Sequence, residues 1–258
     1  MPVHPTALVD PAAGIAATAE IGPYCIVGAQ VEIGAGTRLM ANVYLEGPTT
    51  IGEDNVFYPY STVGVAPQDL KYKGEASATR IGRRNRIREF VTIHRGTEGG
   101  GMLTRIGDDN LLMAYVHIAH DVQVGNGAVL GHGATLGGHV TVGDQANVGA
   151  FSGVHQYCRV GRSAIVGGYS VITQDVLPFS STVSERKNRI FGANKVGLER
   201  RGFPTERIEQ LQTTFRLLSR AGLNTSQAIE RIRAEVPASP ELEELIEFIR
   251  TAKRGYVK

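Results

Sequence analysis

The chain has 258 residues, with 27 Lys and Arg against 25 Asp and Glu, and a formal net charge of +2. This balance carries no overall electrostatic signal for nucleic-acid binding. No apolar run approaches the roughly 18 residues of a membrane helix and no basic, apolar leader opens the sequence, so we expect a cytoplasmic protein with no transmembrane segment.

A six-residue repeat begins almost at the first residue. Large apolar residues occupy every sixth position from Val3 to Val63, then Ile81 to Ile93, and finally Ile106 to Ile172. An α-helix would need a period near 3.6 and an amphipathic strand a period of 2, whereas a period of six is typical of a parallel β-helix. We expect three hexads per coil, with the first and fifth positions facing the core. Cys25 and Cys158 fall at fifth positions, and we interpret both as reduced packing residues.

Two segments interrupt the repeat, near residues 69–80 and 99–105. The first is polar, and the second contains three consecutive glycines, Gly99 to Gly101. We expect both to be loops that leave the coil. Loops that interrupt a repeat tend to map to one face, which is often the binding face.

Histidines gather at outward positions of the repeat. His120, Asp121 and His117 occupy the third, fourth and sixth places of their hexads, so we expect all three side chains to face outward. His139 follows His120 by nineteen residues and should lie on the neighbouring coil, so two histidines and a carboxylate converge on one face. We expect His132, two-thirds of a coil from His120, to be solvated on another side, and we interpret His94 as structural.

Six arginines lie close together in the sequence, and two interpretations remain open. They form either a solvated face or a surface that docks an acidic protein by charge steering. The residues are Arg80, Arg83, Arg84, Arg86, Arg88 and Arg95.

The repeat stops at Pro178, and helical signals follow it. Pro204 opens an apolar-periodic run, Asn224 with Gln227 resembles a capping box, and Ser239 with Pro240 resembles a helix start. We therefore predict a β-helix over residues 1–191 and a helical domain over residues 192–258.

The outward motifs resemble, in their order, those of the acyl-[acyl-carrier-protein]–UDP-N-acetylglucosamine O-acyltransferase family. The resemblance spans nearly the whole chain and is carried by Gln68–Glu75, Ile93–Thr97, His117–Asp121, Gly138–Val140, Val154–Gln156 and Arg200–Phe203. It implies an all-β fold, a left-handed parallel β-helix with a C-terminal α-helical domain, which assembles as a homotrimer with active sites between subunits. The implied activity is transfer of a 3-hydroxyacyl group from acyl carrier protein to the 3-hydroxyl of UDP-N-acetylglucosamine, the first step of lipid A biosynthesis.

The resemblance also implies roles for individual residues. His120 is similar to the general base of the family, Asp121 to its supporting neighbour, and Gly138 to the residue whose backbone N–H binds the oxyanion. No metal or cofactor is implied. The substrate and donor groove is implied to contain Asp69, Lys71, His117, His139, His155, Gln156, Asn194 and Arg200.

Two positions depart from the family pattern. Val196 stands where the family often has Glu, and Lys187 stands near the place of a His that measures the acyl chain, so the preferred chain length stays open. Three other functions also remain open at this point. They are the same transfer to a 3-amino sugar, a zinc hydrase on the same coil with three histidines around the metal, and a non-enzymatic scaffold.

Overall fold

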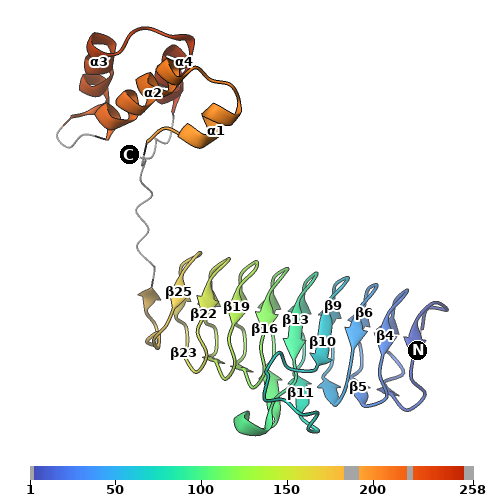
Figure 1. The fold of residues 1–258 in the computed structure, drawn as a ribbon. Coiled ribbons are helices and arrows are strands. Elements are labelled where there is room, and N and C mark those ends of the chain that lie inside the picture. Colours follow the sequence, from blue (N-terminus) through green and yellow to red (C-terminus); the bar gives the residue numbers. More distant parts are fainter. Residues whose placement is uncertain (1–2, 183–191, 220–222, 253–258) are drawn as a thin grey trace. The chain divides into compact units, whose positions relative to one another are not determined.

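The computed structural model describes residues 3–182, 192–219 and 223–252 (Figure 1). By contacts the chain divides into two compact units, Met1–Ser184 and Glu185–Lys258. The boundary predicted between residues 191 and 192 falls at the edge of a segment outside the described residues and stays a prediction. In the described part of the chain, no helix is long and apolar enough to cross a membrane.

The first unit is a parallel β-helix whose strands form three sheets (Figure 1). The first sheet contains β1 (Leu8–Val9), β4 (Ile26–Val27), β7 (Tyr44–Leu45), β10 (Thr62–Val65), β13 (Thr92–His94), β16 (His117–Ile118), β19 (Thr135–Leu136), β22 (Gly153–Val154) and β25 (Val171–Ile172). The second contains β2 (Gly14–Ile15), β5 (Val31–Ile33), β8 (Thr49–Ile51), β11 (Ala78–Ile81), β14 (Leu103–Ile106), β17 (Gln123–Val124), β20 (Thr141–Val142) and β23 (Arg159–Val160). The third contains β3 (Glu20–Ile21), β6 (Arg38–Leu39), β9 (Val56–Phe57), β12 (Arg86–Ile87), β15 (Leu111–Leu112), β18 (Val129–Leu130), β21 (Asn147–Val148), β24 (Ile165–Val166) and β26 (Ser181–Thr182).

The pairing register confirms three hexads per coil. His117 pairs with Thr135, eighteen residues later. The spacing between paired residues lengthens at two successive coils, and it does so in all three sheets. In the first sheet, Thr62 pairs with Thr92, and Thr92 pairs with His117. These spacings of 30 and 25 residues exceed eighteen by 12 and 7, so the two interruptions are loops of those lengths.

Both loops leave the coil at the same corner. The first connects β10 to β11 and the second connects β13 to β14, so each lies between a strand of the first sheet and a strand of the second. We call the turns that lead from the first sheet to the second the loop corner. The second loop contains a short 3-10 helix, η1 (Glu98–Gly100).

The core of the coil is filled by the first and fifth positions of the hexads. Ile118 and Val122 are fully buried, as are the corresponding residues of the next coil. Both cysteines are buried and free, so the packing role predicted for them is confirmed. Burial of each of these aliphatic side chains contributes about 1.5–3 kcal/mol to the stability of the fold. Each coil buries a similar set and adds a similar increment.

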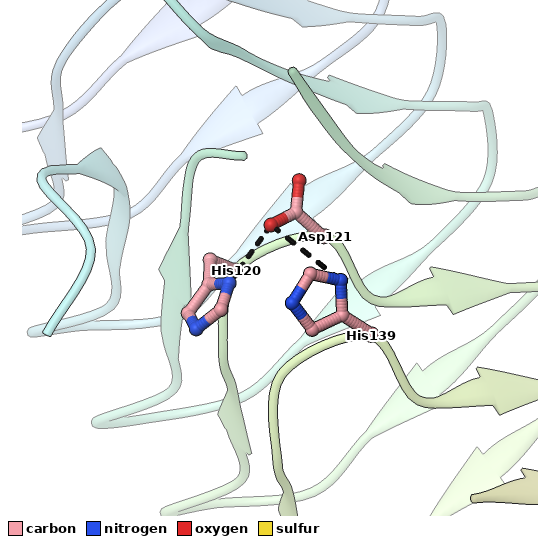
Figure 2. Close-up of side chains that lie close together, drawn as sticks. All are labelled: His120, Asp121 and His139. Atoms are coloured by element: carbon pink, nitrogen blue, oxygen red, sulfur yellow. Dashed lines mark hydrogen bonds and ion pairs between the residues drawn. The ribbon is translucent and has the colours of Figure 1, made fainter. Parts of the chain in front are cut away.

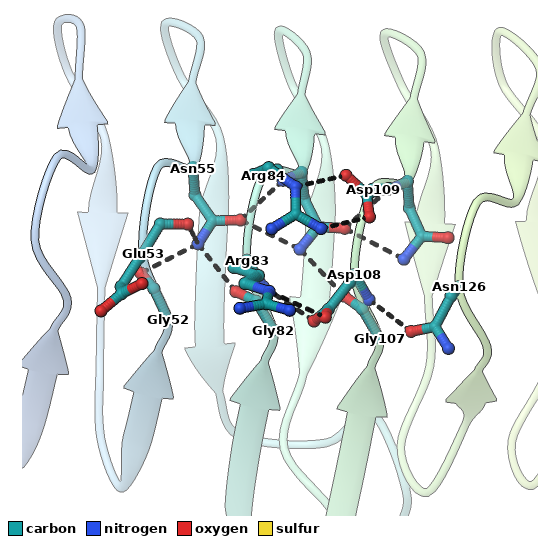
Figure 3. A network of polar contacts seen from close by, with 12 residues as sticks. Gly52, Glu53, Asn55, Gly82, Arg83, Arg84, Gly107, Asp108, Asp109 and Asn126 are labelled. Atoms are coloured by element: carbon teal, nitrogen blue, oxygen red, sulfur yellow. Dashed lines mark hydrogen bonds and ion pairs between the residues drawn. The ribbon is translucent and has the colours of Figure 1, made fainter.

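A ladder of three buried asparagines replaces aliphatic packing at one corner (Figure 3). The backbone and side-chain amides of Asn85 both donate to Oδ1 of Asn55 at 2.9 Å, and those of Asn110 donate to Oδ1 of Asn85. Ala128 closes the ladder by donating to Oδ1 of Asn110. Because each buried amide is satisfied, the ladder explains why polar Asn110 occupies a fifth position.

The prediction of one arginine cluster is wrong. Arg80 lies on β11 of the second sheet, Arg86 on β12 of the third, and Arg95 at the loop corner. Because about eighteen residues make one full coil, arginines that are close in the sequence lie on different sides of it. Arg84 also forms a bidentate pair with Asp109 (Figure 3), and Arg88 pairs with its neighbour Glu89, so neither presents a free charge for an acidic partner.

The coil extends one strand beyond the end predicted for the repeat at Pro178. Strand β26 follows that proline and pairs in parallel with β24, Ile165 opposite Ser181, at a spacing of 16 residues rather than eighteen. The polar composition of Ser181 and Thr182 hid this last strand.

The second unit contains four helices among its described residues: α1 (Lys195–Arg200), α2 (Thr205–Leu218), α3 (Thr225–Glu235) and α4 (Pro240–Thr251). The capping box of Asn224 and Gln227 is present, and Ser239 caps α4 ahead of a proline at its first turn. The apolar faces of α2, α3 and α4 pack together around Leu217, Ile232 and Ile246.

Candidate active site

Successive turns of the loop corner stack the predicted catalytic residues above one another. The amide of His139 donates to the carbonyl of His120 at 3.1 Å, and the amide of Tyr157 donates to the carbonyl of Gly138 at 3.0 Å. The coil therefore places His120 and Asp121 beneath Gly138 and His139, with His155 and Gln156 one coil farther on (Figure 2 shows His120, Asp121 and His139).

His120 and Asp121 form a hydrogen-bonded dyad. Nδ1 of His120 lies 2.8 Å from Oδ2 of Asp121. Because a carboxylate can only accept, Nδ1 carries the proton, and Nε2 is left with a free lone pair. Nε2 points away from Asp121 (Figure 2), and the His120 side chain retains 15% of its exposure. This is the geometry of a general base with a fixed tautomer.

The expectation that Asp121 faces solvent is wrong. Its side chain is fully buried because the second loop folds over it. The amide of Thr97 donates to Oδ1 at 2.9 Å and the hydroxyl of Thr97 donates to Oδ2 at 2.5 Å. The amide of Asp121 itself donates to the hydroxyl of Thr104. Hexad position predicted the direction of the side chain, but not what covers it.

His139 lies beside the dyad rather than within it. Its Nδ1 is 3.9 Å from Oδ2 of Asp121, and its ring meets that of His120 edge-on at 5.0 Å. Its other side stacks on Tyr157 at 4.4 Å. Desolvation by burial lowers the pKa of His139, the neighbouring His120 lowers it further, and the carboxylates of Asp121 and Asp69 oppose this.

His117 and His94 occupy the first sheet next to the dyad. Nδ1 of His117 is hydrogen bonded to the hydroxyl of Thr92 at 2.7 Å, and burial lowers the pKa of His117. His94 meets His117 edge-on at 4.9 Å and is only 4% exposed. Burial, with His117 and His120 nearby, lowers the pKa of His94 to about 4. We therefore expect His94 to be neutral at physiological pH.

Gly138 allows the backbone to approach the base closely. A Cβ at this position would lie 2.6 Å from Cε1 of His120 and 2.7 Å from its Nε2. Gly138 is a buried residue, and its amide donates to no group among the described residues. The backbone amide of His132, at the equivalent position one hexad earlier, also donates to no group among the described residues. Gly138 differs from it in having an imidazole beside it.

The first loop brings Asp69 and Lys71 to the same corner. Oδ1 of Asp69 accepts from the amide of Lys71 at 3.0 Å, and its charge is close enough to influence the pKa of His139. The loop is tied to the coil through Tyr72, whose hydroxyl accepts from Nε of Arg95 at 2.8 Å. The Lys71 side chain is exposed.

The remaining predicted residues are exposed. His155 and Gln156 lie at the loop corner, where Nδ1 of His155 contacts the carbonyl of Gln156 at 3.1 Å. Asn194 caps the start of α1 and Arg200 lies in its last turn. Val196 is 57% exposed on the same helix. Lys187 lies outside the described residues.

The structure adds two residues that sequence reasoning missed and corrects a third. Thr97 contacts Asp121, and Tyr157 stacks on His139. The eighteen-residue coil could have identified Tyr157 from His139, whereas Thr97 required the length of the second loop. His132 is not simply solvated, because its ring packs between Tyr115 and Phe151 on another corner.

One group among the described residues has the donors for a metal ion, namely His120, Asp121 and His139. Its ligand atoms lie within 4.8 Å of one another. The donor set has two histidines rather than the three expected of the zinc hydrase, and Oδ2 of Asp121 already accepts from His120 and Thr97. The arrangement suits proton transfer better than metal binding.

Comparisons with known proteins agree with this geometry. Residues 103–138 match the family described as bacterial transferase hexapeptide (six repeats), and residues 175–257 match the family described as UDP N-acetylglucosamine O-acyltransferase, domain 2. The chain is 46% identical, over 98% of its length and 98% of the relative's, to the acyl-[acyl-carrier-protein]–UDP-N-acetylglucosamine O-acyltransferase of Thermodesulfovibrio yellowstonii.

Solved structures give the same result. The UDP-N-acetylglucosamine acyltransferase of Bacteroides fragilis is 39% identical with a TM-score of 0.69, covering 99% of this chain and all of that one. The UDP-N-acetylglucosamine O-acyltransferase of Moraxella catarrhalis is 42% identical with a TM-score of 0.70, and both chains are fully covered. Together with the three parallel sheets, these matches confirm the predicted fold class, a left-handed parallel β-helix with a helical C-terminal part.

Proposed function

Because the chain belongs to the acyl-[acyl-carrier-protein]–UDP-N-acetylglucosamine O-acyltransferase family, we propose that it transfers a 3-hydroxyacyl group from acyl carrier protein to the 3-hydroxyl of UDP-N-acetylglucosamine. This reaction is the first step of lipid A biosynthesis. The observation that carries the proposal is the dyad of His120 and Asp121, in which a buried carboxylate holds Nδ1 and leaves Nε2 facing outward.

The dyad supplies the base that the reaction needs. A sugar hydroxyl is too weakly acidic to attack a thioester unaided at neutral pH. Nε2 of His120 takes the hydroxyl proton as the oxygen bonds to the thioester carbon, and Asp121 stabilises the imidazolium that forms. The tetrahedral intermediate then collapses, the carbon–sulfur bond breaks, and the carrier thiol leaves with a proton returned from the imidazolium.

The oxyanion of that intermediate needs a hydrogen-bond donor close to the base. Gly138 is buried, its amide donates to no described group, and a Cβ added to it would lie 2.6 Å from the His120 ring. A backbone donor that is fixed before the reaction stabilises developing charge without reorganisation, and one such donor is typically worth about 10²–10³ in kcat. We assign this role to Gly138.

The proposed substrate groove lies around the dyad and takes polar side chains from the first loop and from successive coils: Asp69, Lys71, His117, His139, His155 and Gln156. The family resemblance also assigns substrate contacts to Asn194 and Arg200, which belong to α1 of the second unit. The cationic side chains of Lys71 and Arg200 suit phosphate groups of the nucleotide sugar or the carrier. The neutral state expected of His117 and His139 suits contacts with sugar hydroxyls.

The proposed assembly is a homotrimer in the cytoplasm. The outward face of the first sheet exposes the apolar side chains of Leu8 (65%), Ile26 (41%) and Val171 (66%). A second copy of the chain that covers this face would bury them and provide a wall opposite His117. Light scattering at micromolar protein tests the trimer, and a fully active monomer would contradict it.

The alternatives make different experimental predictions. N-acylation would require a 3-amino sugar, whereas the relatives are named for N-acetylglucosamine, which has a hydroxyl at that position. A zinc hydrase would contain stoichiometric zinc on metal analysis. The deciding assay presents carrier proteins with different 3-hydroxyacyl chains to UDP-N-acetylglucosamine and to its 3-amino analogue. The proposal would be overturned if only the 3-amino sugar were acylated, or if neither of the two sugars were acylated.

A further inference from the structure

Thr97 contacts the catalytic carboxylate instead of capping its own helix. It occupies the N-cap position of η1, where a Thr hydroxyl ordinarily accepts from an amide of the first turn, but it makes no such bond. Its hydroxyl donates to Oδ2 of Asp121 at 2.5 Å and its amide donates to Oδ1 at 2.9 Å. Thr97 is 5% exposed, so this pair of bonds is shielded from water.

Gly100 covers the other side of the same carboxylate. A Cβ on Gly100 would lie 2.0 Å from Cγ of Asp121, too close for any side chain. Its neighbour Gly99 differs, since a Cβ there would meet nothing within 4 Å. The second loop therefore needs glycine at residue 100 because of Asp121, and not because of the general flexibility of a glycine run.

The second loop is held in this position by further contacts. The amides of Gly100 and Met102 both donate to the carbonyl of Thr97, at 3.1 and 2.9 Å. The amide of Glu98 donates to Oε1 of Glu75 at 3.3 Å, which joins the second loop to the first. The segment that covers Asp121 is thus connected to the loop that carries Asp69 and Lys71.

We propose that Thr97 and Gly100 are positioning residues that act on the base through Asp121, and that the second loop is a cap on the catalytic carboxylate. The inference rests on the roles proposed above for His120 and Asp121. Three donors converge on Asp121: two from Thr97 and Nδ1–H of His120. They set the rotation of the carboxylate, so that Oδ2 is presented to His120 and Nε2 is aimed at the groove. Exclusion of water strengthens each of these hydrogen bonds.

The first test removes the hydroxyl alone. Thr97→Val keeps the shape and the amide bond to Oδ1. By analogy with hydrogen bonds that orient metal-ligating side chains, whose loss typically costs about 10- to 100-fold, we expect kcat to fall by that factor. The KM values for both substrates should change less than about threefold, because Thr97 is buried beneath the groove. Thr97→Ser restores the hydroxyl and should recover most of kcat.

A matched control is available in Thr79. It is 1% exposed and its hydroxyl has no partner among the described residues. Thr79→Val removes the same buried group from a neighbouring strand and should leave kcat unchanged. If Thr97→Val keeps more than half of wild-type kcat, or if Thr97→Ser is as slow as Thr97→Val, the positioning role is wrong.

A double-mutant cycle distinguishes positioning from general destabilisation. If Thr97 acts only through the carboxylate, Thr97→Val should have little further effect on kcat in an Asp121→Ala background, which has no side-chain acceptor for Thr97. A purely structural role would reduce kcat by the same factor in both backgrounds. If Thr97→Val lowers kcat by the same factor in both backgrounds, the inference is overturned, even if the single variant is slow.

Alanine substitutions at Gly99 and Gly100 provide a second test if Thr97→Val folds poorly. Gly100→Ala should lower kcat at least 10-fold by displacing the carboxylate, whereas Gly99→Ala should match wild type. Equal activity of the two variants would contradict the cap. Failure of the proposed function is distinguishable, because the wild-type protein would then not acylate UDP-N-acetylglucosamine, whereas failure of the base assignment would appear as full activity of His120→Ala, irrespective of any result at residues 97 and 100.

Discussion

The imidazole of His120 is hydrogen bonded to the carboxylate of Asp121, its immediate neighbour in sequence, at 2.8 Å. Neighbouring side chains on an extended strand point to opposite faces. Here Asp121 adopts a positive φ of 61°, a left-handed conformation that Asp tolerates better than most residues. The turn brings both side chains to the same side, so the corner of the coil creates the dyad from two consecutive residues.

Loss of the base should affect the chemical step. His120→Ala is expected to lower kcat by about 10²–10⁴, the usual contribution of a general base. The melting temperature should change little, because Ile118 and Val122, not His120, fill the core at this turn. Steady-state kinetics with both substrates at saturation measure the effect. His132→Ala, on another corner, is the matched control for loss of an imidazole, and the assignment fails if His120→Ala keeps more than about a tenth of kcat.

His139 should contribute to binding more than to proton transfer. Its Nδ1 lies 3.9 Å from Oδ2 of Asp121, beyond hydrogen-bond distance, and desolvation lowers its pKa. We expect His139→Ala to raise the KM for UDP-N-acetylglucosamine by about 3- to 10-fold, equivalent to one lost hydrogen bond, with kcat within a factor of about three. A fall in kcat as large as that of His120→Ala would place His139 in the proton-transfer path instead.

The close approach of Gly138 to the base can be tested by adding one methyl group. A Cβ at residue 138 would lie 2.6 Å from the His120 ring, so Gly138→Ala must displace the imidazole. Misplacement of a catalytic group by about 1 Å can cost on the order of 10² in rate, and we expect kcat to fall by that factor. Gly153→Ala is the control on the next coil, where an added Cβ meets nothing within 4 Å. Comparable kinetics for the two alanine variants would show that the approach is unimportant.

His94 should make stability depend on pH. Burial lowers its pKa to about 4 in the folded state, against roughly 6.5 when unfolded. Below pH 6.5 the unfolded chain binds a proton that the folded chain does not, so the stabilising contribution is complete above pH 6.5 and is lost as pH falls towards 4. At about 1.4 kcal/mol per pH unit, the free energy of unfolding should fall by roughly 2 kcal/mol between pH 7.5 and pH 5 from this residue alone.

Denaturant unfolding at several pH values measures this effect. His94→Gln should remove that part of the pH dependence, while substitution of the exposed His4 by Gln should not change it. His117 and His139, whose pKa values are also lowered by burial, act with the same sign. An unchanged slope in His94→Gln would mean that His94 is not buried as a neutral group.

Much of the architecture follows from the repeat alone. Because the first and fifth positions are apolar or small in nearly every hexad, only a coil with short flat sides can bury them all, and eighteen residues per coil then place His139 beside His120. The family followed from the order of the outward motifs. The role of Asn110 in the folded protein could not be predicted from the sequence. A polar residue at a fifth position has its hydrogen bonds satisfied only when Asn85 and Asn55 align with it.

The sequence by itself determined the coil, its three hexads per turn, the capped helices and the convergence of His120, Asp121 and His139 on one face. Only the tertiary structure decided that Asp121 is buried under Thr97 and Gly100, and that the arginines of residues 80–95 are distributed around a whole coil. The physical reason is the range of the interactions. A period specifies which way each side chain points relative to its neighbours, whereas the path of a loop outside the period depends on the distant groups that satisfy its amides and hydroxyls. Asp121 orients Thr97 as much as Thr97 orients Asp121, and no local pattern encodes a contact made across 24 residues.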